Sequence, residues 1–366
     1  MPPLARVSTA IGLVKLKNHM YASIPLLLLA VVGTQLYGRT VALESHTIQQ
    51  VTTGGDAGTA VVAQNTPRAN FTLAKTLSEH SGGVGAIAIS PDGQTLVSGS
   101  TDKTIKIWNL DTGEVKRTFI GHTAPVLAIA FSPDGQTLVS GSSDKTIKIW
   151  NLRTGKLRRT LSGHSGGIYS VAIDPQGRTL VSGSGDGTIK IWNLRTGELQ
   201  RTLSPRSGMI LSVAISPDGD TLATGNQDLT IKLWNLSSGE LLRTLSGHTY
   251  YAIWSVAFSP DGKTLVSGSQ DTTIKIWNLE NGELLRTVTD QSPVFAVAIS
   301  PDDRTVASGN QTNEVKLWNI NTGDLLQTLS GHTDRVRSIA FSPDGKTLVS
   351  GGSGAGDKTI KIWRLE

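Results

Sequence analysis

The chain has 366 residues, of which 38% are hydrophobic, 17% charged and 5% aromatic, a composition too apolar for a wholly disordered protein. It has no cysteine, which excludes disulfides, thiolate zinc sites, iron–sulfur clusters and cysteine nucleophiles. Five of the 34 Lys and Arg residues and two of the 29 Asp and Glu residues lie in residues 1–70, so the rest of the chain is nearly neutral. A nearly neutral folded part gives no electrostatic sign of nucleic-acid binding.

Residues 1–42 are predicted to be a signal peptide or a signal anchor. Arg6, Lys15 and Lys17 precede an apolar core at residues 21–37, shorter than the about 20 apolar residues of a membrane span. The basic charge favours keeping that end in the cytoplasm and sending the rest across. We therefore expect a periplasmic or exported protein, either secreted or held at the membrane by an uncleaved segment; a cytoplasmic protein is the alternative.

Residues 43–70 are predicted to be a flexible linker. They are rich in Thr, Gly, Ala and Gln and show neither a helical nor a strand period. Regular patterning begins only at residue 71.

From residue 71 to residue 366 the chain repeats itself. One unit contains four strand-like runs, at residues 126–131, 137–140, 146–150 and 157–161, separated by turns. A tryptophan in the third run recurs at intervals of 42, 42, 42, 43, 41 and 45 residues: Trp108, Trp150, Trp192, Trp234, Trp277, Trp318 and Trp363. A period of 40–45 residues with four strands per unit is the signature of propeller blades.

The two ends of the repeat region fit together. The last unit lacks its fourth strand, because only three residues follow Trp363, whereas residues 71–78 match a fourth strand and precede the first unit. Pairing of this N-terminal strand with the last unit would close a ring of seven blades and remove the exposed strand edges.

Residues 71–366 resemble a WD40-repeat β-propeller. With the export-type N-terminus, the chain resembles the periplasmic or membrane-anchored WD-repeat proteins of bacteria, cyanobacteria especially. The resemblance implies an all-β, seven-bladed propeller closed by its N-terminal strand, and a non-enzymatic scaffold that binds protein partners. We expect the propeller to be monomeric and to need no cofactor and no metal.

Five histidines precede the first strand of a unit, with Ser, Asp and Trp at fixed offsets. Ser, His and Asp together suggest a hydrolase, but a catalytic site occurs once whereas this set recurs five times. The resemblance implies instead that each set is a buried hydrogen-bonded tetrad joining three strands. The five expected tetrads are His80, Ser98, Asp102 and Trp108; His122, Ser140, Asp144 and Trp150; His164, Ser182, Asp186 and Trp192; His248, Ser267, Asp271 and Trp277; and His332, Ser350, Asp357 and Trp363.

Two units depart from this pattern. The fourth has Arg206 at the histidine position, and the sixth is expected to have Gln291 and Thr312 in place of His and Asp. We expect these two blades to be the loosest of the seven.

Residues that differ between the units are the best candidates for function. In this family the second residue of the first strand lies at the top entrance of the central channel. These positions, and those just before them, are rich in aromatic, aliphatic and arginine side chains, which are frequent at binding hot spots. The candidate partner-binding residues are Leu127, Tyr169, Met209, Leu211, Tyr250, Tyr251, Trp254, Phe295, Arg335 and Arg337.

The predicted function is docking of a protein or peptide on this top face, with the apolar residues as anchors and the two arginines taking acidic groups. Two alternatives stay open. One is an exported propeller that binds a small ligand or glycan stacked on Trp254 and the tyrosines. The other is a propeller hydrolase with a metal on the axis, for which the entrance positions supply no converging carboxylates or histidines.

Overall fold

The structure, a computed structural model, describes residues 70–366. The expected signal or anchor segment at 1–42 and the expected linker, apart from its last residue, lie outside the described residues. Residues 70–366 form strands and turns without a helix. In this part of the chain, therefore, no helix has the length and apolar character needed to cross a membrane.

The first 14 strands begin before residue 211 and show the length of five to seven residues that recurs throughout. They are β1 (Phe71–Leu77), β2 (Val84–Ile89), β3 (Thr95–Ser100), β4 (Thr104–Asn109), β5 (Val115–Ile120), β6 (Val126–Phe131), β7 (Thr137–Ser142), β8 (Ile147–Asn151), β9 (Leu157–Leu161), β10 (Ile168–Ile173), β11 (Thr179–Ser184), β12 (Ile189–Asn193), β13 (Leu199–Leu203) and β14 (Ile210–Ile215). The second half continues with β15 (Thr221–Asn226), β16 (Thr230–Asn235), β17 (Leu241–Ser246), β18 (Ile253–Phe258), β19 (Thr264–Ser269), β20 (Thr273–Asn278), β21 (Leu284–Thr289), β22 (Val294–Ile299), β23 (Thr305–Asn310), β24 (Glu314–Asn319), β25 (Leu325–Ser330), β26 (Val336–Phe341), β27 (Thr347–Gly352) and β28 (Ile360–Leu365).

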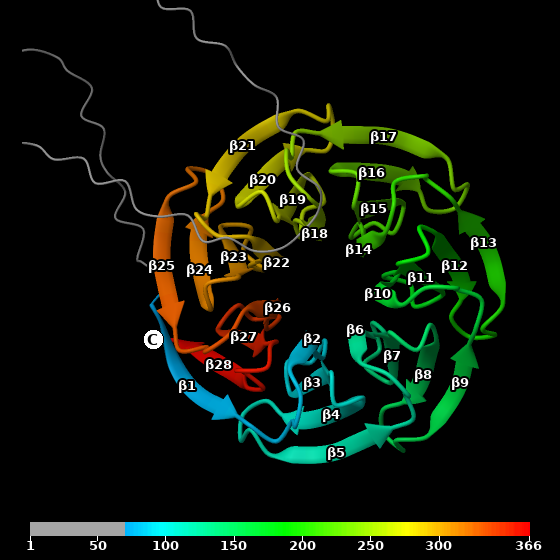
Figure 1. The fold of residues 1–366 in the computed structure, drawn as a ribbon, viewed down its shortest axis with the longest axis vertical. Coiled ribbons are helices and arrows are strands. Elements are labelled where there is room, and N and C mark those ends of the chain that lie inside the picture. The colour runs from blue at the N-terminus through cyan, green and yellow to red at the C-terminus, as the bar shows by residue number, and fades with distance from the viewer. Residues whose placement is uncertain (1–69) are drawn as a thin grey trace, which may run out of the picture. The chain divides into compact units, whose positions relative to one another are not determined.

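The strands form seven four-stranded sheets, the blades, arranged in a ring around a central channel (Figure 1). Blade one is β2-β3-β4-β5, and blades two to six repeat this chain order from the channel outwards. Blade seven is β26-β27-β28-β1, so its outermost strand comes from the N-terminal end of the repeat region. The predicted all-β, seven-bladed fold and its closing strand are confirmed.

The closing strand is held on both of its sides. On one side β1 pairs antiparallel with β28, with Phe71 opposite Leu365 and Leu77 opposite Ile360. On the other side the Gln327 amide, in blade six, accepts a hydrogen bond from the Phe71 N–H at 3.0 Å and donates one to the Phe71 carbonyl at 2.8 Å. Both ends of β1 are apolar and buried, which ties the strand into the ring.

Neighbouring blades touch at a glycine. The first residue of each inner strand is fully buried and packs on the glycine in the second strand of the preceding blade. A Cβ added at Gly141 would lie 2.6 Å from Ile168 Cγ2, and one added at Gly99 would lie 2.6 Å from Val126 Cγ1. Because real carbon atoms do not approach so closely, a larger residue there would push two blades apart.

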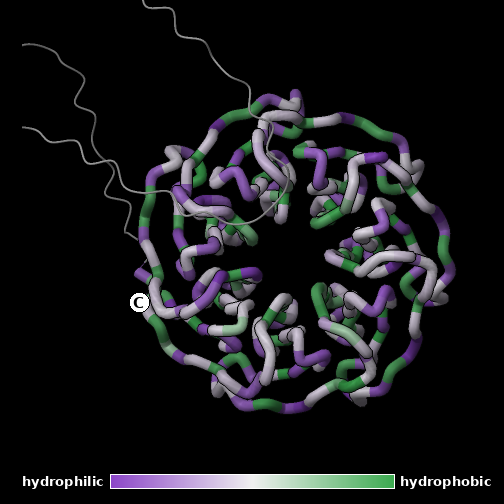
Figure 2. The backbone as a smooth tube through the Cα atoms, in the orientation of Figure 1, coloured by the Kyte–Doolittle hydropathy of each residue, from purple (hydrophilic) through white to green (hydrophobic). Residues whose placement is uncertain are grey.

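The outermost strands of blades one to six are mostly exposed and each buries one residue near its end, and Figure 2 shows both hydrophobic and hydrophilic residues around the circumference. In β9, for example, Leu161 is buried whereas Leu157 is exposed. These strands are the outer edges of their sheets, with most of their side chains in solvent.

We expect loss of β1 to destabilise the ring. A chain that begins at Ser78 would lose the burial of Phe71 and Leu77 and leave β28 as an open edge. Its free energy of unfolding should fall by about 3 kcal/mol or more, and the open edge should promote self-association. Urea unfolding and size-exclusion chromatography, with a chain beginning at Asn70 as the control, would measure both. Equal stability of the two chains would show that the ring closes without this strand.

Candidate interaction site

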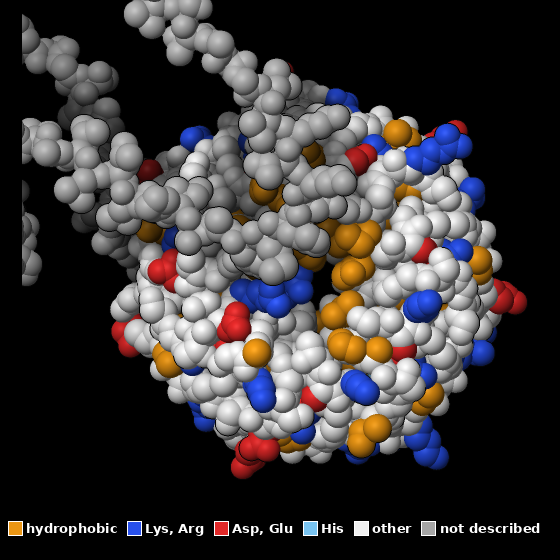
Figure 3. Space-filling model, viewed as in Figure 1, with side chains coloured by type: hydrophobic (Ala, Val, Ile, Leu, Met, Phe, Trp, Pro, Cys, Tyr) orange, Lys and Arg blue, Asp and Glu red, His pale blue; other side chains and the backbone are white. Residues whose placement is uncertain are grey.

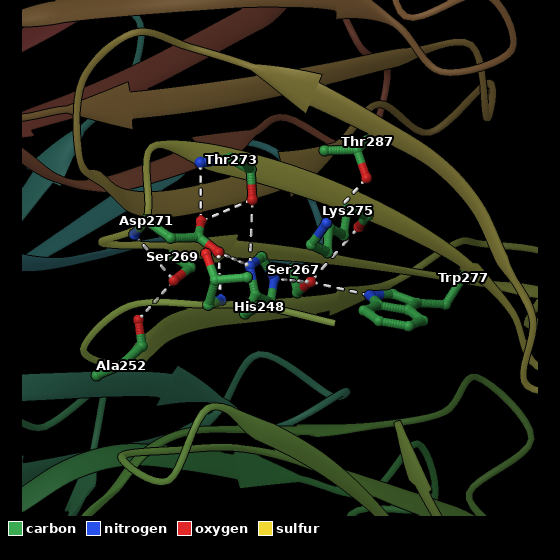
Figure 4. A network of polar contacts seen from close by, with 10 residues as sticks. His248, Ala252, Ser267, Ser269, Asp271, Thr273, Lys275, Trp277 and Thr287 are labelled. Atoms are coloured by element: carbon green, nitrogen blue, oxygen red, sulfur yellow. Dashed lines mark hydrogen bonds and ion pairs between the residues drawn. The ribbon is translucent and has the colours of Figure 1, made fainter. Parts of the chain in front are cut away.

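The five histidine sets form the tetrads that the sequence predicts. In blade five, His248 Nδ1 lies 2.8 Å from Asp271 Oδ2, and His248 Nε2 lies 2.8 Å from Ser267 Oγ (Figure 4). Trp277 Nε1 donates to the same Ser267 Oγ at 2.9 Å. The other four tetrads repeat these contacts within 2.7–2.9 Å. Each tetrad joins the loop before the inner strand to the second and third strands of its blade.

The serine at the centre of each tetrad is sealed inside its blade. Each serine hydroxyl is shared between the histidine Nε2 and the tryptophan Nε1 of its own set. None of these hydroxyls is exposed to solvent, so none can reach a ligand or attack a substrate. The hydrolase pattern that Ser, His and Asp suggest in the sequence is therefore not a site on the surface. The fully buried serines are Ser98, Ser140, Ser182, Ser267 and Ser350.

The remaining members of the tetrads are also buried or nearly so. The five histidines and five tryptophans are all buried. Asp357 is buried as well, whereas Asp102, Asp144, Asp186 and Asp271 are half-buried beneath the loops of their blades. Each aspartate also accepts a hydrogen bond from the backbone N–H of the residue that follows the histidine, at 2.8–3.0 Å.

The tetrads are satisfied when the histidine is neutral. Trp Nε1–H donates to the serine oxygen, the serine hydroxyl donates to His Nε2, and His Nδ1–H donates to the aspartate. Burial lowers the pKa of His80, His122 and His164 more than the aspartate beside each ring raises it. Burial would raise the pKa of Asp102 and Asp144, but hydrogen bonds from a neighbouring threonine and the histidine hold it at about 2. Groups this buried and this fully hydrogen-bonded are structural.

Blade four keeps only part of the tetrad. Trp234 Nε1 donates to Thr224 Oγ1 at 3.3 Å, but Arg206 is exposed and does not take the place of the buried histidine. Asp228 Oδ2 instead lies 3.7 Å from Lys232 Nζ, with the aspartate side chain about a third exposed.

In blade six the sequence interpretation was wrong by one residue. Asp290, not Gln291, lies where the histidine lies in other blades, because Ser308 Oγ donates to Asp290 Oδ2 at 2.9 Å. The aspartate is fully buried, and Lys316 Nζ lies 2.7 Å from its Oδ1. Burial would lower the pKa of Lys316, but the hydrogen bond and charge of Asp290 raise it. A buried ion pair therefore replaces the His–Asp half of the tetrad, whereas Trp318 Nε1 still donates to Ser308 Oγ at 2.8 Å, and the Thr312 hydroxyl bonds to Asn310.

The interaction site begins with a β-bulge in each inner strand. In blade five Ile253 pairs with Ser269 and Ser255 pairs with Gly268, which leaves Trp254 without a partner in the ladder. The same shift occurs in all seven blades, always at the second residue. A bulge leaves its residue unpaired and re-aims its side chain. The seven bulged residues are Gly85, Leu127, Tyr169, Leu211, Trp254, Phe295 and Arg337.

All seven bulged residues line one cavity of about 470 Å³ at an end of the channel, which we call the mouth. Arg335 lines it too. Figure 3 shows basic side chains on one side of the central opening and hydrophobic ones on another. The mouth therefore unites seven of the ten residues that the sequence singled out.

Three candidates lie outside the mouth. Tyr250 and Tyr251 are 58% and 60% exposed, and their rings meet edge to face with centroids 4.3 Å apart. Met209 is half-buried, and its backbone bonds to Gln227. These residues do not line the cavity that Trp254 lines.

Three bulged side chains form a stacked cluster. The rings of Trp254 and Phe295 meet at 83° with centroids 5.6 Å apart. The guanidinium of Arg337 reaches across from blade seven and lies 4.6 Å from the Trp254 ring centre and 5.3 Å from that of Phe295. Burial lowers the pKa of Arg337 from its usual value, and the charge of Arg335 lowers it further.

The two arginines differ in their partners. Arg335 is exposed, and its Nε donates to the Ser353 carbonyl at 2.7 Å. The guanidinium of Arg337 makes no hydrogen bond or ion pair within residues 70–366. It lies over the rings of Trp254 and Phe295. Arg337 is thus a sheltered cation that lies over two aromatic rings and has N–H groups without a hydrogen-bond partner.

One wall of the mouth was not predicted from the sequence. It is built by glycines of blade one and by the loop inserted in blade seven, where Gly83 is so close to Gly354 that a Cβ would meet its nitrogen at 2.9 Å. The three extra residues of that insertion are the feature of the sequence that could have predicted this wall. The lining residues missed were Gly82, Gly83, Thr101, Ser353, Gly354, Ala355 and Lys358.

The described part of the chain contains no group of three or more His, Asp or Glu side chains placed to hold a metal ion.

Comparison with known proteins finds the same repeat. A family model described as the WD domain, G-beta repeat, matches seven times, at residues 71–109, 113–151, 155–193, 197–235, 239–278, 282–319 and 323–364.

Similar curated proteins match over short stretches. An uncharacterized WD repeat-containing protein of Synechocystis is 60% identical over 35 residues, 10% of each chain. WD repeat-containing protein pop1 of Schizosaccharomyces pombe is 40% identical over 67 residues, 17% of this chain and 8% of that one. Pleiotropic regulator 1 of Homo sapiens is 37% identical over 71 residues, 18% and 14% of the two chains. The matched stretches thus span between 8% and 14% of these relatives.

Acid should destabilise the protein in two stages. The unfolded chain binds protons at its histidines near the usual pKa of 6.5, whereas the folded chain resists them at His80, His122 and His164. The free energy of unfolding should therefore decrease as the pH falls below about 6.5, and again below about 4 as the hydrogen-bonded aspartates of the tetrads are protonated. Urea titrations at pH 7.5, 5.5 and 3.5 measure both stages. A free energy that is unchanged or larger at pH 5.5 would contradict this assignment, and His122→Gln should weaken the first stage.

The two blades without a histidine allow a matched test of the buried ion pair. Lys316→Met leaves Asp290 buried and unpaired, so the free energy of unfolding should fall by about 3 kcal/mol or more. Lys232→Met removes the more exposed pair of blade four and should cost below about 1 kcal/mol. Denaturant unfolding of both variants and the wild type would measure the two losses in the free energy of unfolding. Equal losses would mean that water solvates Asp290.

Proposed function

Since the chain belongs to the WD40-repeat family, a family of propeller scaffolds, we propose that its mouth docks a protein or peptide partner. The observation that carries the proposal is the set of bulged side chains. Every blade has the same bulge, yet the residues at it are almost all different, while the buried core around them repeats. A constant frame that presents unlike side chains in one hollow is how repeat proteins make specific binding surfaces.

The chemistry of the mouth fits a protein partner. Trp254 lies partly exposed beside Phe295, Arg337 lies over both of these rings, and Tyr169 lines the same cavity. Tryptophan, tyrosine and arginine supply most of the binding energy at protein interfaces when they lie at the centre of a concave patch. The exposed pair Tyr250 and Tyr251 would extend the surface beyond the mouth.

The same proposal holds that the protein is not an enzyme. The serine, histidine and aspartate of each tetrad satisfy one another beneath the surface, so they offer no free nucleophile or base. The recurrence of the same hydrogen-bonded tetrad in five blades supports a structural role for these residues.

A small ligand such as a glycan is the second candidate. Its support is the mouth volume of about 470 Å³, which lies within the range of small-molecule sites, together with aromatic rings on which a sugar could stack. The predicted signal or anchor in residues 1–42 would place either ligand outside the cytoplasm, and we propose a periplasmic or membrane-anchored location on that sequence pattern.

Two tryptophans should separate docking from folding. Trp254→Ala should weaken partner binding by about 2 kcal/mol or more without unfolding the ring, because Trp254 lies in the mouth. Trp150→Ala should lower the free energy of unfolding by about 3–5 kcal/mol, because Trp150 is buried in a tetrad. The partner would be captured from cell extract with the wild type and each variant in parallel, then titrated calorimetrically as purified protein.

The outcomes distinguish the candidates. A purified partner that binds both the wild type and Trp254→Ala equally would move the site off the mouth. Competition by a monosaccharide mixture, with no protein captured, would favour the glycan. Equal melting temperatures of the two variants would contradict the division between mouth and tetrad.

A further inference from the structure

The charge of the mouth is one-sided. Three cationic side chains line it, Arg335, Arg337 and Lys358, and all three belong to blade seven. None of the residues that line the mouth is an Asp or a Glu. The propeller as a whole is nearly neutral, so this local excess is a property of the mouth and not of the surface in general.

The acid that precedes Arg335 in the chain is already engaged. Asp334 accepts a hydrogen bond from the Arg335 backbone N–H at 2.8 Å and one from the Gly356 N–H at 3.2 Å. Its carboxylate thus fixes the inserted loop, and within residues 70–366 it makes no ion pair with a side chain of the mouth. The three cations are left without an internal counter-charge there.

Arg337 is the best placed of the three to select a ligand. A cation sheltered from water without a counter-charge is costly unless something pairs with it. The guanidinium carbon of Arg337 lies over the rings of both Trp254 and Phe295, which holds the group in the mouth. Its N–H groups have no partner within residues 70–366, and two parallel N–H groups of a guanidinium match the two oxygens of a carboxylate.

The wall opposite the aromatic rings leaves room for a backbone. Gly85 is the only bulged residue without a side chain, and a Cβ added there would have no atom closer than Val126 O at 3.5 Å. A peptide backbone can lie against this wall while its side chains reach the rings and the cations. Because three cations are spread from Arg337 to the rim at Lys358, a single carboxylate would leave most of the charge unmatched.

We infer that the mouth recognises an acidic segment of its protein partner, with one Asp or Glu carboxylate on Arg337, an apolar side chain on Trp254 and a further acid near Arg335 and Lys358. This inference rests on the proposed docking function and specifies its chemistry. It makes Arg337 the residue that sets specificity and Trp254 the residue that supplies apolar contact area.

The test uses the purified full-length chain and synthetic peptide libraries. Each library consists of acetylated, amidated dodecamers with a fixed centre and degenerate flanks. The fixed centres are Glu-Leu-Glu, Gln-Leu-Gln, Lys-Leu-Lys and phosphoserine-Leu-phosphoserine. A fifth library carries Gln-Leu-Gln with a free C-terminal carboxylate. Binding of each library to the protein is measured by fluorescence polarisation at 0.05 and 0.15 M salt.

The wild-type chain should bind the Glu-Leu-Glu library at least about tenfold more tightly than the Gln-Leu-Gln library, with the larger difference at low salt. Arg337→Gln should abolish that preference. Arg337→Lys keeps the charge but not the planar edge, so it should retain only part of it. Lys116→Gln removes a charge from the outer strand β5 and is the matched control, which should leave the preference intact. Melting curves establish that each variant is folded. If Arg337→Gln does not fold, Arg335→Gln replaces it in the test and should lose a smaller part of the preference for the Glu-Leu-Glu library.

Four results would overturn the inference. Equal binding of the Glu and Gln libraries, both weakened by Trp254→Ala, would leave docking at the mouth standing and remove the acidic preference. Tighter binding of the phosphoserine library than the Glu library would reassign the cations to phosphate. Binding of the neutral library only with a free terminus would reassign them to a chain end. Binding of no library would count against the docking function itself.

Discussion

Each blade of the ring rests its inner strand on a glycine of the blade before it, and the remaining structure follows from that contact. The first inner-strand residue is fully buried there, as Ile168 is against Gly141, and it is the link between two otherwise separate sheets. A four-stranded sheet alone cannot bury both of its faces, so the contact has to be repeated until the ring closes. The missing Cβ sets the spacing of the blades, and the spacing in turn sets the width of the channel.

Because the frame is repeated so closely, specificity has only a few places to arise. The bulge lifts one residue of each inner strand out of the ladder, so that residue can vary without disturbing the sheet. Trp254, Phe295 and Arg337 exploit this freedom and contact one another across three blades. The tetrads do the opposite: they bury polar groups in a fixed pattern that tolerates little change. Function and rigidity are thus assigned to residues only a few positions apart in the chain.

Much of this could be predicted from the sequence, because a fixed period carries both the strand count and the closing strand. The mouth residues were found because they vary where everything around them repeats. The prediction of Gln291 was wrong although the spacing favours its neighbour: Asp290 lies 28 residues before Trp318, as His80 lies 28 residues before Trp108. In the structure Ser308 donates a hydrogen bond to Asp290, 18 residues earlier in the chain, and the same 18 residues separate Ser98 from His80. This contact identifies Asp290 as the residue at the histidine position. Arg337 of blade seven extends over rings of blades five and six. That contact depends on the conformation of its side chain, which the spacing of residues in the sequence does not specify.

The closing strand also has a consequence for the order in which the ring is completed during synthesis. β1 leaves the ribosome first among the described strands, yet its partner β28 is the last of them, and Asn70 bonds to Glu366 across 296 positions. Blades one to six can form one after another as they emerge, each from strands that are neighbours in the chain. Blade seven must wait until β28 has been made, with β1 kept available throughout. The final step of folding is therefore a single long-range closure, the slowest kind of contact to form.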